Sequence, residues 1–189
     1  MRAYYPGLIP ALWAGWALYW WIASRGAKPV ARRESVGSRL GHIVPLVLAA
    51  YLCTARHIPG WLGERFLSSG ESTFVAGVVL VVLGVLLTVW ARVALGGNWS
   101  GTVTLKEGHE IVTTGPYRRI RHPIYTGLLL MFLGSAIACG EWRGLVASII
   151  AFVALWRKLK LEERWLKEHF GAPYSDYCKT SAALIPFIF

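Results

Sequence analysis

The chain has 189 residues, of which 55% are hydrophobic and only 16% are charged. With a mean hydropathy of +0.46, this composition excludes an ordinary soluble domain and indicates one membrane domain over residues 1–189. The net charge of +10 could suit nucleic acid. However, basic residues interleaved with apolar segments are typical of membrane topology and of contact with anionic lipid headgroups. We expect membrane lipids as partners and no nucleic acid.

Five apolar segments predict transmembrane helices. A helix needs about 20 residues to cross a hydrocarbon core of about 30 Å, although shorter segments are tolerated. The segments are 7–23, 41–62, 73–95, 123–140 and 142–156. Pro45 and Arg56 interrupt the second, so the first two could instead form a hairpin of tilted helices. The predicted fold is an all-α integral membrane protein of about five helices, with an N-terminal helical pair (1–62) and a catalytic core (73–189).

Basic residues are distributed unevenly between the two ends of these segments. Sixteen lie at one end: Arg25, Lys28, Arg32, Arg33, Arg39, Arg92, Lys106, Arg118, Arg119, Arg121, Arg157, Lys158, Lys160, Arg164, Lys167 and Lys179. Four lie at the other: Arg2, Arg56, Arg65 and Arg143. Because Lys and Arg concentrate in cytoplasmic loops, we expect a multi-pass protein with its N-terminus outside and its C-terminus in the cytoplasm.

The connection between the third and fourth segments predicts a short β-hairpin or a looped lid. Residues 103–105 and 111–114 are rich in β-branched side chains and flank the turn-forming residues 106–110. On the predicted topology this connection lies at the cytoplasmic end. It could therefore cover a site there.

Polar residues stand at the entrance to the fourth segment, in the stretch Gly115-Pro-Tyr-Arg-Arg-Ile-Arg-His-Pro-Ile-Tyr-Thr-Gly127. Pro123 suits the first position of a helix, so His122 would precede that helix as its cap. The positive helix end and Arg121 can hold a carboxylate or phosphate. Tyr117 and Tyr125 offer faces for an adenine or a sulfonium cation. Each residue alone fits a topology anchor or an aromatic belt, but the combination indicates a site.

A second polar block follows the fifth segment. There, Glu163 occupies a gap in an apolar stripe at helical spacing, formed by Trp156, Leu159, Leu166 and Phe170. A carboxylate on a buried stripe needs a partner, which a bound cofactor or a nearby arginine could supply. The alternative is a solvated helix on which Glu163 pairs with Lys167. No metal site is predicted, because the cysteines and histidines lack ligand spacing.

Together the two blocks resemble the isoprenylcysteine carboxyl methyltransferase family, whose superfamily includes phospholipid N-methyltransferases. The matching residues are Gly115-Pro-Tyr117, Arg121-His-Pro-x-Tyr125-x-Gly127, Glu162-Glu163, Phe170-Gly171, Tyr174, Tyr177 and Ile185-Pro186-Phe187. The resemblance runs from about residue 95 to the C-terminus. It implies a helical S-adenosylmethionine-dependent methyltransferase with a cytoplasmic cofactor pocket in its C-terminal half. The implied acceptor is lipophilic, in the first place the carboxylate of an isoprenylcysteine-like substrate, and enters from the bilayer.

The resemblance also implies individual site residues. The family's cofactor contacts correspond to His109, Glu110, Ile111, Val112, Tyr117, His122, Pro123, Ile124, Tyr125 and Glu162. The register on Phe170-Gly171 favours Glu162 as the cofactor's glutamate, whereas the apolar stripe favours Glu163, and both stay candidates for catalysis together with Arg121. Arg157 and Lys158 are candidates for binding the acceptor. The family usually has an arginine where this chain has Lys158, and a lysine cannot make the same bidentate clamp.

Several alternatives stay open. The acceptor could be a phospholipid or a small hydrophobic thiol or amine, whose proton Glu162, Glu163 or His122 could accept. A sterol-type membrane reductase is a different class, in which an arginine cluster (Arg118, Arg119 and Arg121) would hold the 2′-phosphate of NADPH. A non-catalytic module that binds anionic lipid is another. Gly77 and Gly84 could permit close helix packing within the chain or between chains, so the oligomeric state is not predicted.

Overall fold

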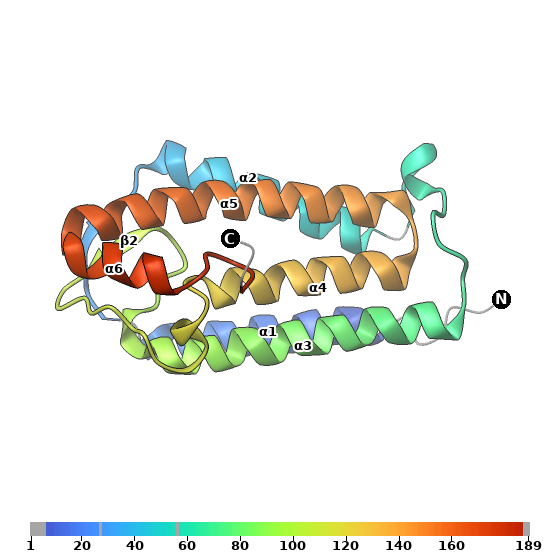
Figure 1. The fold of residues 1–189 in the computed structure, drawn as a ribbon. Helices are drawn as coiled ribbons and strands as arrows, with labels where there is room; N and C mark the ends of the chain where they lie inside the picture. Colours follow the sequence, from blue (N-terminus) through green and yellow to red (C-terminus); the bar gives the residue numbers. More distant parts are fainter. Residues whose placement is uncertain (1–6, 27, 56, 187–189) are drawn as a thin grey trace.

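The computed structural model describes residues 7–26, 28–55 and 57–186, so Arg2, Arg56 and Phe187 lie outside it. Five long helices run side by side, with α2 and α5 on one side of α4 and with α1 and α3 on the other (Figure 1). These helices are α1 (Leu8–Ala23), α2 (Val36–Thr54), α3 (Glu71–Leu95), α4 (Pro123–Cys139) and α5 (Trp142–Phe170). The shorter elements are η1 (Ser24–Gly26), β1 (Val30–Arg33), η2 (Trp61–Gly63), η3 (Gly96–Asn98), β2 (Thr104–Lys106), η4 (Gly115–Arg118) and α6 (Ala172–Thr180).

Each predicted segment corresponds to a helix, but two of the predicted boundaries were wrong. Helix α2 begins at Val36 and ends at Thr54 rather than covering 41–62. Its start is fixed by Ser35, whose hydroxyl accepts a hydrogen bond from the Ser38 N–H and caps the helix. Helix α5 continues to Phe170, beyond the predicted end at 156, because the residues that follow form a polar helix with one buried face.

Within the described residues, two stretches are long and apolar enough to cross a membrane, α2 with a mean hydropathy of 1.5 and residues 71–98 with 2.7. Helices α1 and α4 are apolar but shorter, at 16 and 17 residues. Large apolar side chains are exposed along the outside of the bundle, including Val47, Leu86 and Ile149. A lipid environment accepts such a surface, whereas water does not. The fold is therefore that of a helical membrane protein, and the count of five spans stays a prediction.

Glycines bring α3 and α4 into backbone contact. A Cβ atom on Gly77 would lie 2.5 Å from the Gly134 carbonyl oxygen, and one on Gly84 would lie 2.5 Å from the Gly127 carbonyl oxygen. Such distances exclude any larger residue unless the helices separate. Their spacing left open whether these glycines pack helices within the chain or between chains. The structure shows that they pack α3 against α4 within the chain.

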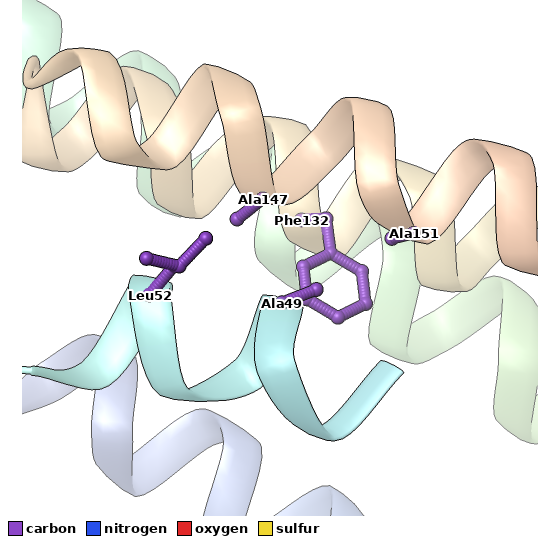
Figure 2. Packing of buried hydrophobic residues seen from close by; sticks show 5 residues of the cluster. All are labelled: Ala49, Leu52, Phe132, Ala147 and Ala151. Atoms are coloured by element: carbon purple, nitrogen blue, oxygen red, sulfur yellow. The ribbon is translucent and has the colours of Figure 1, made fainter. Parts of the chain in front are cut away.

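The core between α2, α4 and α5 is built from one ring and several small side chains. Phe132 on α4 inserts among Ala49 and Leu52 on α2 and Ala147 and Ala151 on α5 (Figure 2). The alanines let the three helices approach closely enough to enclose the ring. This core fixes the ends of α4 and α5 relative to each other.

Of the two alternatives predicted for the connection before α4, the β-hairpin was wrong and the loop is present. Strand β2 pairs antiparallel with β1, with Val30 opposite Lys106 and Arg33 opposite Thr104. Residues 111–114 form no strand; Ile111 and Val112 line the cavity described below, and Thr113 and Thr114 are exposed. The pairing partner comes from a distant part of the chain, so local β-propensity could not identify it. The pair ties the N-terminal half of the chain to the loop that precedes α4.

Candidate functional site

A cavity of about 350 Å³ lies where the polar half of α5, the loop before α4 and helix α6 meet. Its volume falls in the range of small-molecule sites, about 300 to 1,000 Å³. One part of the wall is polar and aromatic, and the other part is apolar. The apolar part comes from all five long helices and includes Trp16, Leu46, Leu95, Leu128 and Leu155.

Most of the residues predicted to contact the cofactor line this cavity. They are His109, Glu110, Ile111, Val112, Tyr117, His122, Ile124, Tyr125 and Glu162. Pro123 is absent from the wall because it forms the first turn of α4, where it is buried behind His122. The structure thus brings together two sequence blocks about 35 residues apart.

Tyr125 and Glu162 form the central polar pair of the wall. The Tyr125 hydroxyl donates a hydrogen bond of 2.6 Å to Glu162 Oε2. The His122 ring stacks on the Tyr125 ring, with centroids 5.2 Å apart and an interplanar angle of 6°. The Glu162 side chain keeps 34% of its surface exposed, so its carboxylate offers a negative charge to a guest in the cavity.

Glu163 points away from the cavity and holds the first motif block in place. Its Oε1 lies 2.6 Å from Arg121 Nε and 3.5 Å from His122 Nε2. The Arg121 guanidinium also donates to the main-chain carbonyls of Cys178 and Ser181. Burial raises the pKa of Glu163, but the neighbouring His122 ring and the hydrogen-bonded Arg121 guanidinium outweigh it and lower that pKa to about 2. The carboxylate is therefore ionised and has the arginine partner that its place on the stripe required.

These contacts separate the two glutamates that the sequence left as equal candidates. Glu162 faces the cavity, whereas Glu163 does not line it. Arg121 also lines the cavity, but its guanidinium is engaged by Glu163 and by the C-terminal segment. Glu163 and Arg121 act as supports for the site.

Lys158 and Arg157 point in opposite directions. Lys158 Nζ donates a hydrogen bond of 2.7 Å to the Gly101 carbonyl and lies 5.3 Å from the centre of the Tyr125 ring. The side chain lines the cavity, although Lys158 is only 8% exposed. Arg157 instead donates to the Ser38 carbonyl on α2 and packs over Gly41. The structure does not bring Arg157 to the cavity, because successive helical positions face different directions.

Sequence reasoning missed the contribution of the first two helices to the wall. Trp16 is fixed by a hydrogen bond of 3.0 Å from its Nε1 to Thr88 Oγ1, and the Trp20 ring packs edge-on against Trp99 with centroids 5.8 Å apart. The tryptophan-rich composition of α1 was visible. Nothing in one sequence, however, shows which tryptophans turn inward.

The polar part of the cavity suits a charged nucleoside-derived ligand. Asn98 Oδ1 and Thr104 Oγ1 are buried and have no hydrogen-bond partner in the described part of the chain, so they are available to ligand hydroxyl or amino groups. Glu162 supplies a negative charge, and Tyr117 and Trp99 supply aromatic faces. Within the described residues no group of three or more His, Cys, Asp or Glu side chains could hold a metal ion.

A helical membrane bundle whose cavity is lined by polar, aromatic and apolar side chains is typical of a membrane protein that binds a small molecule. The family model described as phospholipid methyltransferase matches residues 72–173. This match covers more than half of the chain, and the chain belongs to that family.

Within the family, the chain is similar to protein-S-isoprenylcysteine O-methyltransferases. It is 26% identical to protein-S-isoprenylcysteine O-methyltransferase B of Arabidopsis thaliana over 175 residues, which cover 88% of this chain and 84% of the relative. It is 34% identical to the Saccharomyces cerevisiae protein-S-isoprenylcysteine O-methyltransferase over 60% of this chain and 49% of the relative.

A solved structure has the same fold. The structure of the eukaryotic intramembrane Ras methyltransferase ICMT, isoprenylcysteine carboxyl methyltransferase, matches with a TM-score of 0.56 and 24% identity, over 80% of this chain and 51% of that one. The chain thus spans about half the length of that protein and of the yeast relative, but most of the length of the plant relative.

Proposed function

We propose that this protein transfers a methyl group from S-adenosylmethionine to the carboxylate of an isoprenylcysteine-like acceptor. The observation that carries the proposal is one cavity in which an anionic pair, Glu162 with Tyr125, lies beside a buried cation, Lys158, and an apolar chamber. The names of the similar proteins support the same reaction.

The polar half of the cavity would hold the cofactor. Glu162 would attract its positive charge, and Tyr125 would keep the Glu162 carboxylate in place. His109, Ile111 and Val112, with Tyr117 opposite, would enclose its adenosine part. Bound there, S-adenosylmethionine supplies an electrophilic methyl group on a sulfonium. The protein itself would exclude water and align the reactants. Because the charges of the sulfonium and the carboxylate cancel as they react, these two effects can account for most of the rate acceleration.

The apolar half of the cavity would hold the lipid tail, and Lys158 would bind the acceptor's carboxylate. An ammonium has three donors, of which the Gly101 carbonyl takes one. A carboxylate nucleophile needs no general base. An amine acceptor would instead have to approach a buried cation, which disfavours it. We infer that the tail enters laterally from the bilayer through the chamber lined by Trp16 and Leu46.

The reductase alternative lacks the cations it would need. Arg118 and Arg119 are exposed and do not line the cavity. Arg121 is held by Glu163 and by main-chain carbonyls. A 2′-phosphate would therefore find no free guanidinium among these three arginines.

Thermal unfolding of the detergent-purified protein tests the cofactor. S-adenosylmethionine, S-adenosylhomocysteine and NADPH would each be added at about a hundredfold excess over the dissociation constant, which should add about 2.7 kcal/mol for a ligand of the native state. We expect stabilisation by the two sulfur compounds and none by NADPH. Stabilisation by NADPH alone would overturn the proposal.

The acceptor is tested by transfer of a labelled methyl group to an N-acylated S-prenylcysteine. The matched control is the carboxamide of the same compound, which keeps the prenyl tail but lacks the nucleophile. We expect label in the first compound only. Label in phosphatidylethanolamine and not in the prenylcysteine would reassign the acceptor to a phospholipid.

A further inference from the structure

A buried carboxylate behind the cavity has no role in the reaction as proposed so far. Glu34, between β1 and α2, is only 5% exposed. Its Oε1 accepts a hydrogen bond of 3.0 Å from the Val103 N–H, and its Oε2 accepts one of 2.8 Å from the Ser38 hydroxyl. His42 Nε2 lies 3.5 Å from Oε1. Glu34 precedes the stretch matched by the family model, which begins at residue 72.

Glu34 and Lys158 hold the same short piece of main chain. Residues 101–103, here called the strap, receive the Lys158 ammonium at the Gly101 carbonyl and present the Val103 N–H to the Glu34 carboxylate. Gly101 and Thr102 are part of the cavity wall. The strap therefore fixes Lys158 Nζ at the cavity, and Glu34 fixes the strap.

Two carboxylates act on the charge of Lys158. Lys158 lies beyond the proposed membrane-spanning part of α5, residues 142–156. The pKa of Lys158 is lowered from its ordinary value, because burial has the largest effect and the carboxylates of Glu162 and, after it, Glu34 offset it only in part. From the other elements it faces the Tyr125 ring on α4, the Gly101 carbonyl, and His42 on α2, with Arg157 beside it on α5. Of these two carboxylates, Glu162 is partly solvated and bonded to Tyr125, whereas Glu34 is fully buried.

We propose that Glu34 is a positioning residue for the acceptor: its carboxylate holds the strap that fixes Lys158 Nζ and places a buried negative charge behind that strap. This inference rests on the proposed function, since it gives Lys158 the acceptor's carboxylate as its ligand. It places a determinant of acceptor binding in the N-terminal half of the chain.

The variant Glu34→Gln tests the charge, because its amide oxygen can still accept the Val103 N–H. We expect the alkaline limb of kcat/KM for the S-prenylcysteine to move to lower pH by about one unit, which is a tenfold loss at a fixed pH on that limb. KM for S-adenosylmethionine should change less than about twofold, since Glu162 and Tyr125 are untouched. A purely structural role would lower stability without moving the limb.

Matched variants sharpen this test. Glu168→Gln removes a half-exposed carboxylate on the same end of the molecule and should leave the profile unchanged. Lys158→Arg keeps a charge that does not titrate in the working range, so its alkaline limb should disappear, and adding Glu34→Gln should then move nothing. A shift of the limb by Glu34→Gln that persists in the Lys158→Arg background would overturn the inference.

A measurement without substrate covers the case in which Glu34→Gln is unstable. If the two charges compensate each other, the double variant Glu34→Gln/Lys158→Met should unfold at a higher temperature than the Lys158→Met single variant, which buries an unpaired carboxylate. No gain, or no folded double variant, would overturn the pairing.

Different experimental results would contradict the proposed function and the role of Glu34. A wild-type protein that binds S-adenosylhomocysteine but methylates no prenylcysteine would overturn the proposed acceptor and, with it, the positioning role of Glu34. An active wild type whose Glu34→Gln variant keeps the wild-type pH profile would overturn the inference alone.

Discussion

Two neighbouring glutamates on α5 have different roles because successive helical positions face different directions. Glu162 and Glu163 differ in direction by about 100° on α5. As a result, Glu162 meets the Tyr125 hydroxyl at the cavity, while Glu163 meets the Arg121 guanidinium behind it. The register of the resemblance favoured Glu162 as the cofactor's glutamate, and Glu162 is the one that lines the cavity. The apolar stripe favoured Glu163 instead; it correctly indicated a buried carboxylate with a partner, but that partner is Arg121 and Glu163 does not line the cavity.

At the residue scale, Tyr125→Phe should weaken cofactor binding without unfolding the protein. The variant removes the donor that fixes Glu162 Oε2 but keeps the ring that stacks on His122. A hydrogen bond to a charged group typically contributes about 1.5 to 3 kcal/mol, and losing part of this should raise the dissociation constant for S-adenosylmethionine, whose positive charge Glu162 would attract, by up to about tenfold. Calorimetric titration measures it. Tyr51→Phe, which alters an exposed ring on α2, is the control, and equal affinities in the two variants would contradict the assignment.

The Glu163–Arg121 pair predicts a pH dependence of stability. The pKa of Glu163 is about 2 in the folded protein and about 4.3 in an unfolded chain. A lowered pKa means that its contribution is present above the unfolded value and is lost as the pH falls toward 2. Glu163→Gln leaves Arg121 buried without its partner and should destabilise by about 3 kcal/mol. The gap in Tm between wild type and variant should be largest above pH 5 and shrink on acidification.

The result that would count against this view is a gap that stays constant from pH 7 to pH 3. Glu168→Gln serves as the control, because Glu168 forms a half-exposed pair with Arg32 and such surface pairs contribute little. Its Tm should follow the wild type at every pH.

At the scale of elements, the close contact of α3 and α4 sets the position of the first motif block. Gly84→Ala would place a methyl group 2.5 Å from the Gly127 carbonyl oxygen and should destabilise the protein by about 1 to 3 kcal/mol. Because Tyr125 lies on the same turn of α4 as Gly127, the displaced helix should also bind S-adenosylhomocysteine more weakly. Thermal unfolding and titration measure the two effects. Gly15→Ala on α1, where nothing lies within 4 Å, should change neither, and an unperturbed Gly84→Ala would refute the packing argument.

How far the sequence predicted these elements depends on how local their determinants are. The helices and the turn at Pro123 follow from apolar runs and from proline geometry, which neighbouring residues decide. The pairing of β1 with β2, the inward turn of Trp16 and the contact of Glu34 with Val103 join residues about 70 or more positions apart. No local pattern specifies such contacts. The cofactor-contacting residues of the site were predicted from the resemblance of the two motif blocks, which begins at about residue 95, and so the N-terminal part of the wall lay outside that prediction.

At the scale of the whole molecule, the charge asymmetry is stronger than the count of basic residues suggests. At the end opposite the cavity, Arg143 is buried, bonded to Glu141 and to the carbonyls of Leu52 and Ala55. At the cavity end, Arg118, Arg119 and other basic side chains are exposed. Partly buried and compensated charge influences orientation little, whereas exposed Lys and Arg near helix ends hold a loop in the cytoplasm. The arrangement therefore favours a cytoplasmic cavity, where a soluble cofactor is available.

Reporter fusions test this orientation in cells. A fluorescent protein fused after the C-terminus should fluoresce, because it folds in the cytoplasm, while alkaline phosphatase fused at the same point should be inactive. The reverse pattern is expected for both reporters at the N-terminus. Replacing Arg118 and Arg119 by alanine should shift part of the population to the opposite orientation, since these exposed charges do not line the cavity and contribute mainly to topology. An active phosphatase at the C-terminus of the wild type would place the cavity outside and remove its access to the cytoplasmic cofactor.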